Sequence, residues 1–327
     1  MRYLLMKALV LREKGVWPQL EEYPSPEPKE GEVLVSLLAA ALNHRDLWIV
    51  KGLYPGIRYP VILGSDGMGL LEGREVIINP GMNWGDDERV QSKAFSILGL
   101  PANGTLADYV VVPAKQIYDK PSHLSVEEAA ALPLAGLTAY RVLFSRCGLQ
   151  AGERVLITGV GGGVALMACQ MALAAGAEVF VSSGSDEKLQ KVKALGVAGG
   201  VNYREKDWPA RLKAMAGGFD VIIDSAGGKG FAALPDLCRP AARIGLYGGT
   251  CGAITGLSPQ RLFWYQLNIL GSTMGSDRDF RLMLDFVNRH QLRPLVDQVF
   301  PLSRGPEAFA YLDQGRQLGK VVLKLGA

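Results

Sequence analysis

The segment RVLITGVGGGVA, residues 154–165, is an apolar strand that runs into a cluster of glycines opening a helix. Glycines at such a turn permit a tight bend and bring backbone N–H groups close to a pyrophosphate, which also meets the positive end of the helix dipole. The strict spacing G-x-G-x-x-G fails at Val164, but G-x-x-G-x-x-A from Gly159 fits a related form. The segment predicts a dinucleotide-binding turn; a glycine-rich turn without a ligand is the alternative. We expect these turn residues to contact the dinucleotide: Gly159, Gly162, Gly163 and Val164.

Strands and helices alternate on both sides of this turn. The expected strands are 154–158, 178–182, 221–224, 243–247 and 269–273, and the expected helices are 163–175, 186–195 and 231–238. Buried strands separated by helices of this length are typical of a parallel α/β sheet. We therefore predict an α/β fold whose residues 125–267 form a Rossmann domain with a doubly wound parallel sheet.

The two ends of the chain have a different pattern. Short apolar strands punctuated by glycine and proline are expected at 7–11, 32–38, 75–79 and 107–112, and the C-terminal part adds a helix at 279–289 and strands at 295–300 and 320–325. Many short strands with turn residues between them favour a barrel. A chain of 327 residues supports about two domains. We expect residues 1–124 and 268–327 to form one β-barrel domain.

The end of the second strand after the glycine turn indicates which dinucleotide binds. An NAD-type site places a carboxylate there for the ribose hydroxyls, and a carboxylate would repel the 2′-phosphate of NADPH. Ser182 and Ser183 stand at this point, and we expect both to contact the cofactor. The acids that follow, Asp186 and Glu187, suit the first turn of a helix. Lys188 opposes the helix dipole in the same turn, so we expect it to pair with a phosphate; a solvated surface lysine is the alternative. The pattern favours NADPH over NADH.

Composition and charge exclude several classes of protein. The chain has 35 Lys and Arg against 32 Asp and Glu without a basic block, so we expect no nucleic-acid partner. No run of 18 apolar residues exists and the N-terminus lacks the apolar core of a signal peptide, so we expect no membrane span and a cytoplasmic location. The 4 cysteines are far apart, which favours a reducing compartment, and no local zinc pattern is present.

Six segments spread over nearly the whole chain jointly resemble one enzyme family, although each is weak alone. They are MKALV at 6–10, NHRD at 43–46, GSDG at 64–67, ALPLAGLTAY at 131–140, VNYR at 201–204 and GKVV at 319–322. The chain resembles the medium-chain dehydrogenase/reductase family, most of all its zinc-free quinone oxidoreductase branch. The resemblance implies a GroES-like β domain beside the Rossmann domain, with an active cleft between the two.

The resemblance also bears on metal binding. Zinc-dependent members place a cysteine where this chain has Asn43, a histidine and a glutamate at Ser65 and Asp66, and another cysteine near Leu134. Asn and Leu supply no thiolate, and a lone aspartate does not make a tetrahedral site. The lobe that carries 4 cysteines in those relatives corresponds to residues 79–103, which contain none. We expect neither a catalytic nor a structural zinc.

The resemblance implies the residues around the nicotinamide. Asn43 and Asp46 match residues near the nicotinamide and its ribose, Thr138 matches one at the nicotinamide end, and Tyr54 matches a tyrosine in the cleft. Without a metal, the negative charge that develops on the substrate must be met by hydrogen-bond donors, such as the Asn43 amide, the Tyr54 hydroxyl or backbone N–H groups. We expect Asn43, Asp46 and Tyr54 to be the catalytic residues.

Further cofactor contacts are implied at the adenosine end and along the sheet. Lys188 and Tyr203 match residues that hold the adenosine 2′-phosphate, in agreement with the charge argument. Ser225, Tyr247 and Gly248 follow the fourth and fifth strands, where cofactor contacts gather in such sheets. Plain packing is the alternative for Tyr54, Ser225 and Tyr247.

The expected activity is metal-free hydride transfer from NADPH to a quinone or an α,β-unsaturated carbonyl compound. A metal-dependent alcohol dehydrogenase and a non-catalytic NADPH-binding regulator are the alternatives. We expect a homodimer formed through the edge strand 269–273, because an unpaired apolar edge invites pairing. Segment 72–75 is shorter than the hairpin of relatives, so similarity does not identify the acceptor.

Overall fold

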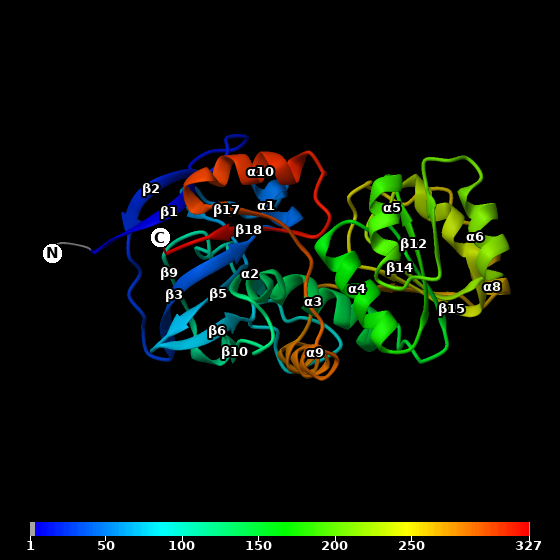
Figure 1. Ribbon diagram of the computed structural model, residues 1–327, viewed down its shortest axis with the longest axis horizontal. Helices are drawn as coiled ribbons and strands as arrows, with labels where there is room; N and C mark the ends of the chain where they lie inside the picture. The colour runs from blue at the N-terminus through cyan, green and yellow to red at the C-terminus, as the bar shows by residue number, and fades with distance from the viewer. Residues whose placement is uncertain (1–3, 327) are drawn as a thin grey trace. The chain divides into compact units, whose positions relative to one another are not determined.

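The computed structural model describes residues 4–326, which form two compact units (Figure 1). Residues 4–134 and 276–326 make up the first unit, so both ends of the chain contribute to it. Residues 135–275 make up the second unit. Among the described residues, no helix combines the length and the apolar character that a membrane span requires.

The boundaries between the units differ from the expected ones at 124/125 and 267/268. Helix α2, Val126–Ala131, packs against strands β3, Glu32–Ala41, and β5, Asp66–Leu71, and so belongs to the first unit. Strand β16, Asn268–Gly271, pairs in parallel with β15, Cys238–Leu246, and so belongs to the second. Local sequence pattern predicts an element but does not identify the partner on which it packs.

The second unit is built on a parallel sheet with the strand order β13-β12-β11-β14-β15-β16. Its other strands are β11, Arg154–Ile157, β12, Glu178–Ser183, β13, Gly199–Asn202, and β14, Phe219–Asp224. Its helices are α4, Gly163–Ala174, α5, Asp186–Lys193, α6, Trp208–Ala216, α7, Leu234–Leu237, and α8, Pro259–Trp264. The order starts in the middle at β11 and runs first to one edge and then to the other, which is the doubly wound Rossmann arrangement. The predicted fold class is confirmed, and β11 and β14 flank the point where ligands bind in such sheets.

Two parts of this sheet differ from the sequence expectation. Strand β13 was not expected, because it contains Gly199 and Gly200, which are poor strand formers. A Cβ atom built on Gly200 would lie 2.9 Å from the side chain of Val181, so glycine lets β13 lie against β12. The expected helix 231–238 is a 3-10 turn, Lys229–Ala233, followed by the single-turn α7, and β15 already begins at Cys238.

The first unit contains three sheets. The largest has the order β10-β6-β5-β3-β18-β17, with β9 also paired to β3; the others are β2-β1-β4 and β7-β8. Strands not yet given are β1, Leu5–Leu11, β2, Gln19–Pro24, β4, Val61–Ile62, β6, Arg74–Ile78, β7, Gly81–Met82, β8, Ser96–Ile97, β9, Tyr109–Pro113, β10, Ile117–Asp119, β17, Val296–Pro301, and β18, Lys320–Lys324. The helices are α1, His44–Val50, α9, Asp277–His290, and α10, Gly305–Asp313, and α3, Pro133–Tyr140, follows α2 across the boundary between the units.

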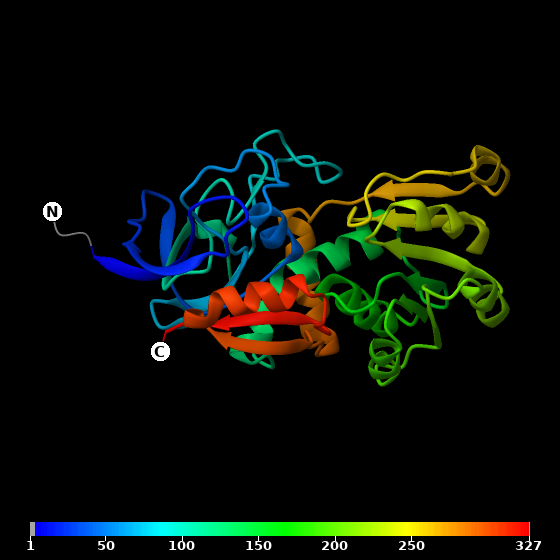
Figure 2. The same ribbon diagram turned by 90° about the horizontal axis from the view of Figure 1, so that it is seen from above.

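One strand pairing joins the two ends of the chain within the first unit. Strand β18 lies beside β17 (Figure 2) and pairs on its other side with β3 in antiparallel register, with Val322 opposite Ala41. The start of β18, Lys320, is thereby brought to the end of β3, where the chain turns into α1. This pairing places Lys320 beside Asn43, which is 277 residues away in the sequence.

Candidate functional site

The glycine-rich turn follows β11 and opens α4, as predicted. Gly159 and Gly161 have φ angles of +64° and +149°, a region that residues with a side chain rarely adopt. Gly162 is the N-cap of α4, and Gly163 and Val164 form its first turn. The first N–H groups of a helix have no acceptor within it, so this turn presents donors toward an anion.

The serines at the end of β12 are hydrogen-bonded to the glycine-rich turn, and a lysine side chain lies over the turn. Ser183 Oγ donates to the Val160 carbonyl at 3.0 Å, and the Val160 N–H donates to the Ser182 carbonyl at 2.8 Å. Lys188 crosses the turn from α5: a Cβ atom built on Gly161 would lie 3.0 Å from Lys188 Cδ and 3.3 Å from its Nζ. The structure therefore brings the predicted Ser182, Ser183 and Lys188 together around the glycines.

A second cation lies beyond β12. A Cβ atom built on Gly184 would lie 2.7 Å from Tyr203 Oη and 3.1 Å from Arg204 Nε, so both side chains gather at this glycine. The Asp186 carboxylate accepts a hydrogen bond from Asn202 Nδ2 at 3.1 Å at the start of α5. The sequence analysis proposed Tyr203 and missed Arg204. The available signal was that Arg204 is a cation directly after Tyr203, while the end of β12 has no acid.

Ser225, Tyr247 and Gly248 lie at the carboxyl ends of β14 and β15. A Cβ atom built on Gly159 would lie 3.6 Å from Ser225 Oγ, which places Ser225 beside the glycine turn. The Tyr247 hydroxyl is hydrogen-bonded to Ser225, and burial raises the pKa of Tyr247, so it is neutral. A Cβ atom on Gly248 would lie 2.6 Å from the Ser225 carbonyl oxygen, so glycine permits this close approach. Their contact with a cofactor stays a prediction.

Thr138 lies on α3 and is buried. Its hydroxyl donates to the sulfur of Met274 at 3.9 Å. A thioether is a weak acceptor, so a carbonyl or amide oxygen of a ligand would compete for this donor. The role of Thr138 at the nicotinamide stays a prediction.

Asp46 has a structural role that the sequence expectation did not assign to it. Its carboxylate accepts from the Asn43 N–H at 2.8 Å and from the Gly64 N–H at 3.4 Å, at the start of α1. The side chain is completely buried, and this burial raises the pKa of Asp46. These contacts show that Asp46 holds the backbone of Asn43, and its catalytic and cofactor-binding role stays a prediction.

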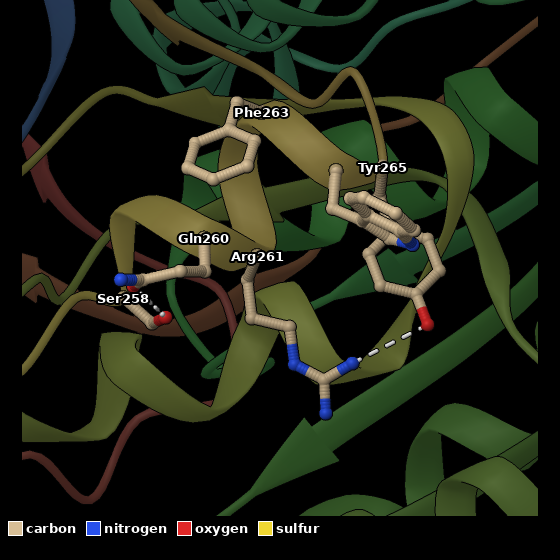
Figure 3. A pocket seen from close by; sticks show the side chains of 6 residues that line it. Ser258, Gln260, Arg261, Phe263 and Tyr265 are labelled. Atoms are coloured by element: carbon tan, nitrogen blue, oxygen red, sulfur yellow. Dashed lines mark hydrogen bonds between the residues drawn. The ribbon is translucent and has the colours of Figure 1, made fainter.

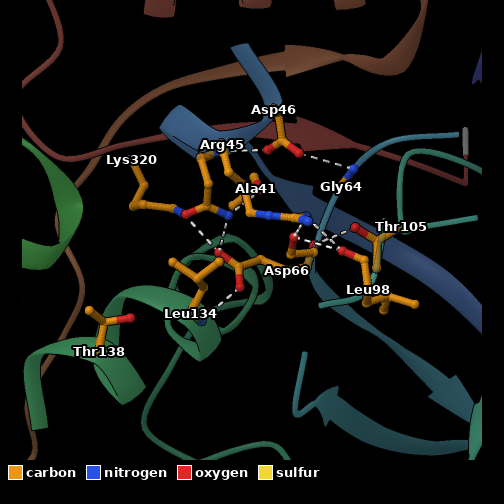
Figure 4. Close-up of polar contacts among 12 residues, drawn as sticks. Ala41, Arg45, Asp46, Gly64, Asp66, Leu98, Thr105, Leu134, Thr138 and Lys320 are labelled. Atoms are coloured by element: carbon orange, nitrogen blue, oxygen red, sulfur yellow. Dashed lines mark hydrogen bonds and ion pairs between the residues drawn. The ribbon is translucent and has the colours of Figure 1, made fainter. Parts of the chain in front are cut away.

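A buried ion pair occupies the centre of the candidate site in the first unit (Figure 4). Lys320 Nζ donates to Asp66 Oδ2 at 2.8 Å and to Asn43 Oδ1 at 2.6 Å. Asp66 also accepts from Asn43 Nδ2 at 2.9 Å and from the Leu134 N–H at 2.7 Å. The side chains of Lys320 and Asp66 are 4% and 0% exposed, so water does not replace these contacts. Two of the positions that the resemblance aligns with zinc ligands, Asn43 and Asp66, thus contact an ammonium group.

Asn43 is hydrogen-bonded to both members of this ion pair. Its Nδ2 donates to Asp66, with a second, longer contact of 3.5 Å to the Ala41 carbonyl, and its Oδ1 accepts from Lys320. The amide is therefore engaged inside the cluster, where it contacts both Asp66 and Lys320, and its donation to the substrate stays a prediction. Sequence reasoning missed Lys320, whose signal was a lysine at the head of the apolar strand KVVLK.

The donors in this cluster do not fit a zinc ion. Among residues 4–326, no group of three His, Cys, Asp or Glu side chains could hold a metal. Asp66 is neutralised by Lys320, and the Ser65 hydroxyl is engaged with the Leu98 carbonyl at 2.8 Å. Zinc sites use thiolates, imidazoles and unpaired carboxylates. Independence from a metal stays a prediction, for which metal analysis of the protein is the test.

Arg45 and Tyr54 form the other side of the cluster. Arg45 Nη1 donates to Ser65 Oγ at 2.6 Å and to the Leu98 carbonyl at 2.9 Å. The guanidinium carbon lies 5.3 Å from the centroid of the Tyr54 ring, which is a cation–π distance. The predicted Tyr54 therefore contacts the cluster with its aromatic ring. The sequence analysis missed Arg45.

A surface hollow of about 520 Å³ lies apart from these residues in the second unit (Figure 3). It is formed by α8 and its flanks, with Ser258, Gln260, Arg261, Phe263, Trp264 and Tyr265 as lining. Arg261 donates to the Tyr265 hydroxyl at 3.4 Å. None of the predicted site residues lines this hollow.

Comparison with known proteins agrees with the geometry. The model of the alcohol dehydrogenase GroES-like domain matches residues 29–122, and that of the zinc-binding dehydrogenase matches residues 163–289. A zinc-type alcohol dehydrogenase-like protein of Schizosaccharomyces pombe, C1773.06c, is 38% identical over 93% of this chain and 94% of its own length. The 2-methylene-furan-3-one reductase of Solanum lycopersicum is 30% identical over 91% of this chain and 73% of its own length.

A solved structure extends the similarity to three dimensions. The crystal structure of an NAD-dependent alcohol dehydrogenase has a TM-score of 0.93 and 38% identity, and covers 98% of this chain and 100% of that chain. The GroES-like and Rossmann-like architecture is confirmed. The chain belongs to the zinc-type alcohol dehydrogenase-like group of the medium-chain dehydrogenase/reductase superfamily, whose members bind NAD(P), and is an oxidoreductase.

Proposed function

We propose that the protein uses NADPH to reduce an α,β-unsaturated carbonyl compound or a quinone without a metal ion. The observation that carries this proposal is the ammonium group of Lys320, held by Asp66 and Asn43 where a metal-dependent relative would need free ligands. The name of the tomato relative, a reductase of an unsaturated furanone, supports the acceptor class.

The residues around the glycine turn fit a phosphorylated dinucleotide. Lys188 lies against Gly161, and Tyr203 and Arg204 meet at Gly184, so two cations and a hydroxyl flank the end of β12. A 2′-phosphate forms strong charge-assisted hydrogen bonds with such groups. The structural relative is named NAD-dependent, and the cations of this chain are the reason to propose NADPH here. When bound, the cofactor supplies the hydride.

The residues of the first unit supply the electrostatics. Hydride addition to an enone or a quinone places negative charge on an oxygen, which donors and cations in a dry site stabilise. Lys320 supplies a buried cation that is paired with Asp66; Asp66 and Asn43 fix its position, and Asp46 fixes the backbone of Asn43. The proton that completes the reduced product comes from solvent in this scheme.

The test is an acceptor and cofactor panel on the purified protein, combined with metal analysis. We expect oxidation of NADPH with 3-penten-2-one or 1,4-naphthoquinone, slower oxidation of NADH, no loss of activity with EDTA, and less than 0.1 equivalent of zinc (roughly the background level for a protein without a metal site). Activity restricted to alcohols that is lost with EDTA would show the metal-dependent alternative. NADPH binding without turnover of any acceptor would show the non-catalytic alternative.

We also propose a homodimer formed through β16. This strand pairs with β15 on one side and is the last strand of its sheet, with Ile269 36% exposed. An unpaired apolar edge favours pairing with the same edge of a second copy. Sedimentation should give a dimer for the wild type and a monomer for Ile269→Lys; a monomeric wild type would refute the proposal.

A further inference from the structure

Arg45 is a buried cation that donates no hydrogen bond to a carboxylate, although its charge acts on the neighbouring Asp46. It is 9% exposed, and Nη1 is its only nitrogen with hydrogen-bond partners among residues 4–326, the Ser65 hydroxyl and the Leu98 carbonyl. The nitrogen Nε is buried without any partner. The neighbouring carboxylate, Asp46, is engaged with backbone N–H groups instead. Part of the hydrogen-bonding capacity of this guanidinium is therefore unused.

Such a group has a high free energy in the absence of a ligand. A buried N–H without an acceptor keeps the penalty of its lost hydration, and this penalty is larger when the group is charged. The neighbouring Lys320 is different, because Asp66 neutralises it at 2.8 Å. The hydrogen-bond acceptors of Arg45 are neutral oxygens, so a negatively charged oxygen would stabilise its positive charge best.

The geometry of the guanidinium favours one kind of ligand. With Nη1 bound to Ser65 and Leu98, the edge formed by Nε and Nη2 remains, and this edge matches one oxyanion or the two oxygens of a planar group. The Tyr54 ring covers one face at 5.3 Å, which restricts the approach of a ligand to that edge. A metal-free reductase needs such a donor for the oxygen that gains charge.

We propose that Arg45 is a catalytic residue that binds the carbonyl oxygen of the unsaturated acceptor; this inference rests on the proposed function. The hydride adds to the β-carbon, the π electrons of the C=C bond form the enolate, and its oxygen accepts hydrogen bonds from Arg45. A solvent proton then adds to the α-carbon. The enone is reduced to the saturated ketone and NADPH is oxidised to NADP⁺.

The test compares Arg45→Met and Arg45→Gln with the control Arg74→Met, which removes an exposed arginine of the same unit. Removal of an oxyanion donor lowers kcat by about 10²–10³-fold, so we expect this loss with 3-penten-2-one in both Arg45 variants. The Kd of NADPH should stay within about twofold, because the proposed contact is with the acceptor only. The control should retain wild-type kcat.

A second readout does not require turnover. Crotonate carries the same C=C bond with a carboxylate in place of the ketone, and calorimetric titration should show at least a tenfold weaker Kd in Arg45→Gln than in the wild type (about one charge-assisted hydrogen bond). A folded Arg45→Gln with kcat within threefold of wild type, or with unchanged crotonate affinity, would overturn the proposal, as would a wild type that binds no crotonate.

Two further outcomes are decided by the same design. If both neutral variants fail to fold, the fallback is Arg45→Lys, which keeps the positive charge but loses the planar pair of N–H donors. A kcat of Arg45→Lys within threefold of wild type overturns the assignment. A loss in kcat of about tenfold or more supports it. If the wild type reduces no acceptor, the proposed function fails. The Kd of crotonate, compared between the wild type and the folded Arg45 variants, then still decides whether Arg45 is an oxyanion site.

Discussion

Replacement of Lys320 by methionine tests the buried ion pair directly. Methionine has a similar length and no charge, so it fills the space while removing the ammonium group from Asp66. The Asp66 carboxylate keeps its hydrogen bonds from Asn43 Nδ2 and the Leu134 N–H but loses its counter-charge in a site without exposed surface. The remaining carboxylate is then buried and uncompensated.

The expected magnitude follows from this burial. Removal of one partner of a buried ion pair typically costs about 3–5 kcal/mol, whereas an exposed pair contributes about 0–1 kcal/mol. The matched control is Lys51→Met, because Lys51 pairs with Asp313 at 43% and 33% side-chain exposure in the same unit. For a unit of this size, 1 kcal/mol shifts the Tm by about 2–4 °C, so Lys320→Met should lower it by about 6–20 °C.

The assay is urea unfolding and thermal unfolding of the wild type, the single variants Lys320→Met, Asp66→Asn and Lys51→Met, and the double variant Lys320→Met/Asp66→Asn. The double variant removes both charges, so it should be more stable than Lys320→Met alone. A Lys320→Met protein that loses no more stability than Lys51→Met would refute the reasoning, and so would a double variant whose stability is the sum of the two single losses.

Three more predictions follow from the site. Lys188→Ala and Arg204→Ala should each raise the KM for NADPH by at least tenfold, since each removes about 1.5–3 kcal/mol of charge-assisted hydrogen bonding; an equal rise in the KM for NADH would contradict a 2′-phosphate role. Asn43→Ala should lower kcat by on the order of 10²-fold through displacement of Lys320, with an unchanged Kd for NADPH from fluorescence titration; an unchanged kcat would remove Asn43 from the mechanism. The raised pKa of Asp46 means that the protonated carboxyl stabilises the folded state at low pH, and that this contribution is lost as pH rises through the folded pKa. Urea midpoints should therefore show the stability of the wild type relative to Asp46→Asn falling as pH rises from about 4; a constant difference up to pH 8 would argue against it.

The Rossmann unit was predictable because its signals are local. A strand, a glycine turn and a helix follow one another within 12 residues at 154–165. The backbone N–H groups at the start of such a helix suit a phosphate whatever the side chains are. The absence of an acid at the end of β12 and the cation at Lys188 also lie close together in the sequence. The resemblance added Tyr203, whose side chain lies at Gly184, and its contact with a 2′-phosphate stays a prediction.

The polar cluster of the first unit was not predictable in the same way. Lys320 and Asn43 meet only because β18 pairs with β3, and nothing in the neighbouring residues of either one signals the other. The sequence therefore predicted Asn43 as a donor to the substrate and Asp46 as catalytic, but it did not predict that both would be hydrogen-bonded inside a buried polar cluster. Arg45 was overlooked because an exposed arginine and a buried one look alike in a sequence.

The chain's local patterns specify the sheet, the phosphate turn and the lack of thiolate ligands, since these depend on residues a few positions apart. The buried ion pair of the first unit depends on contacts between residues 254 and 277 positions apart, which the pairing of β18 with β3 brings together. Burial then determines the chemistry, because in a dry interior Asp66 must be neutralised by Lys320, while Arg45 is left with unsatisfied donors that a ligand oxygen can use.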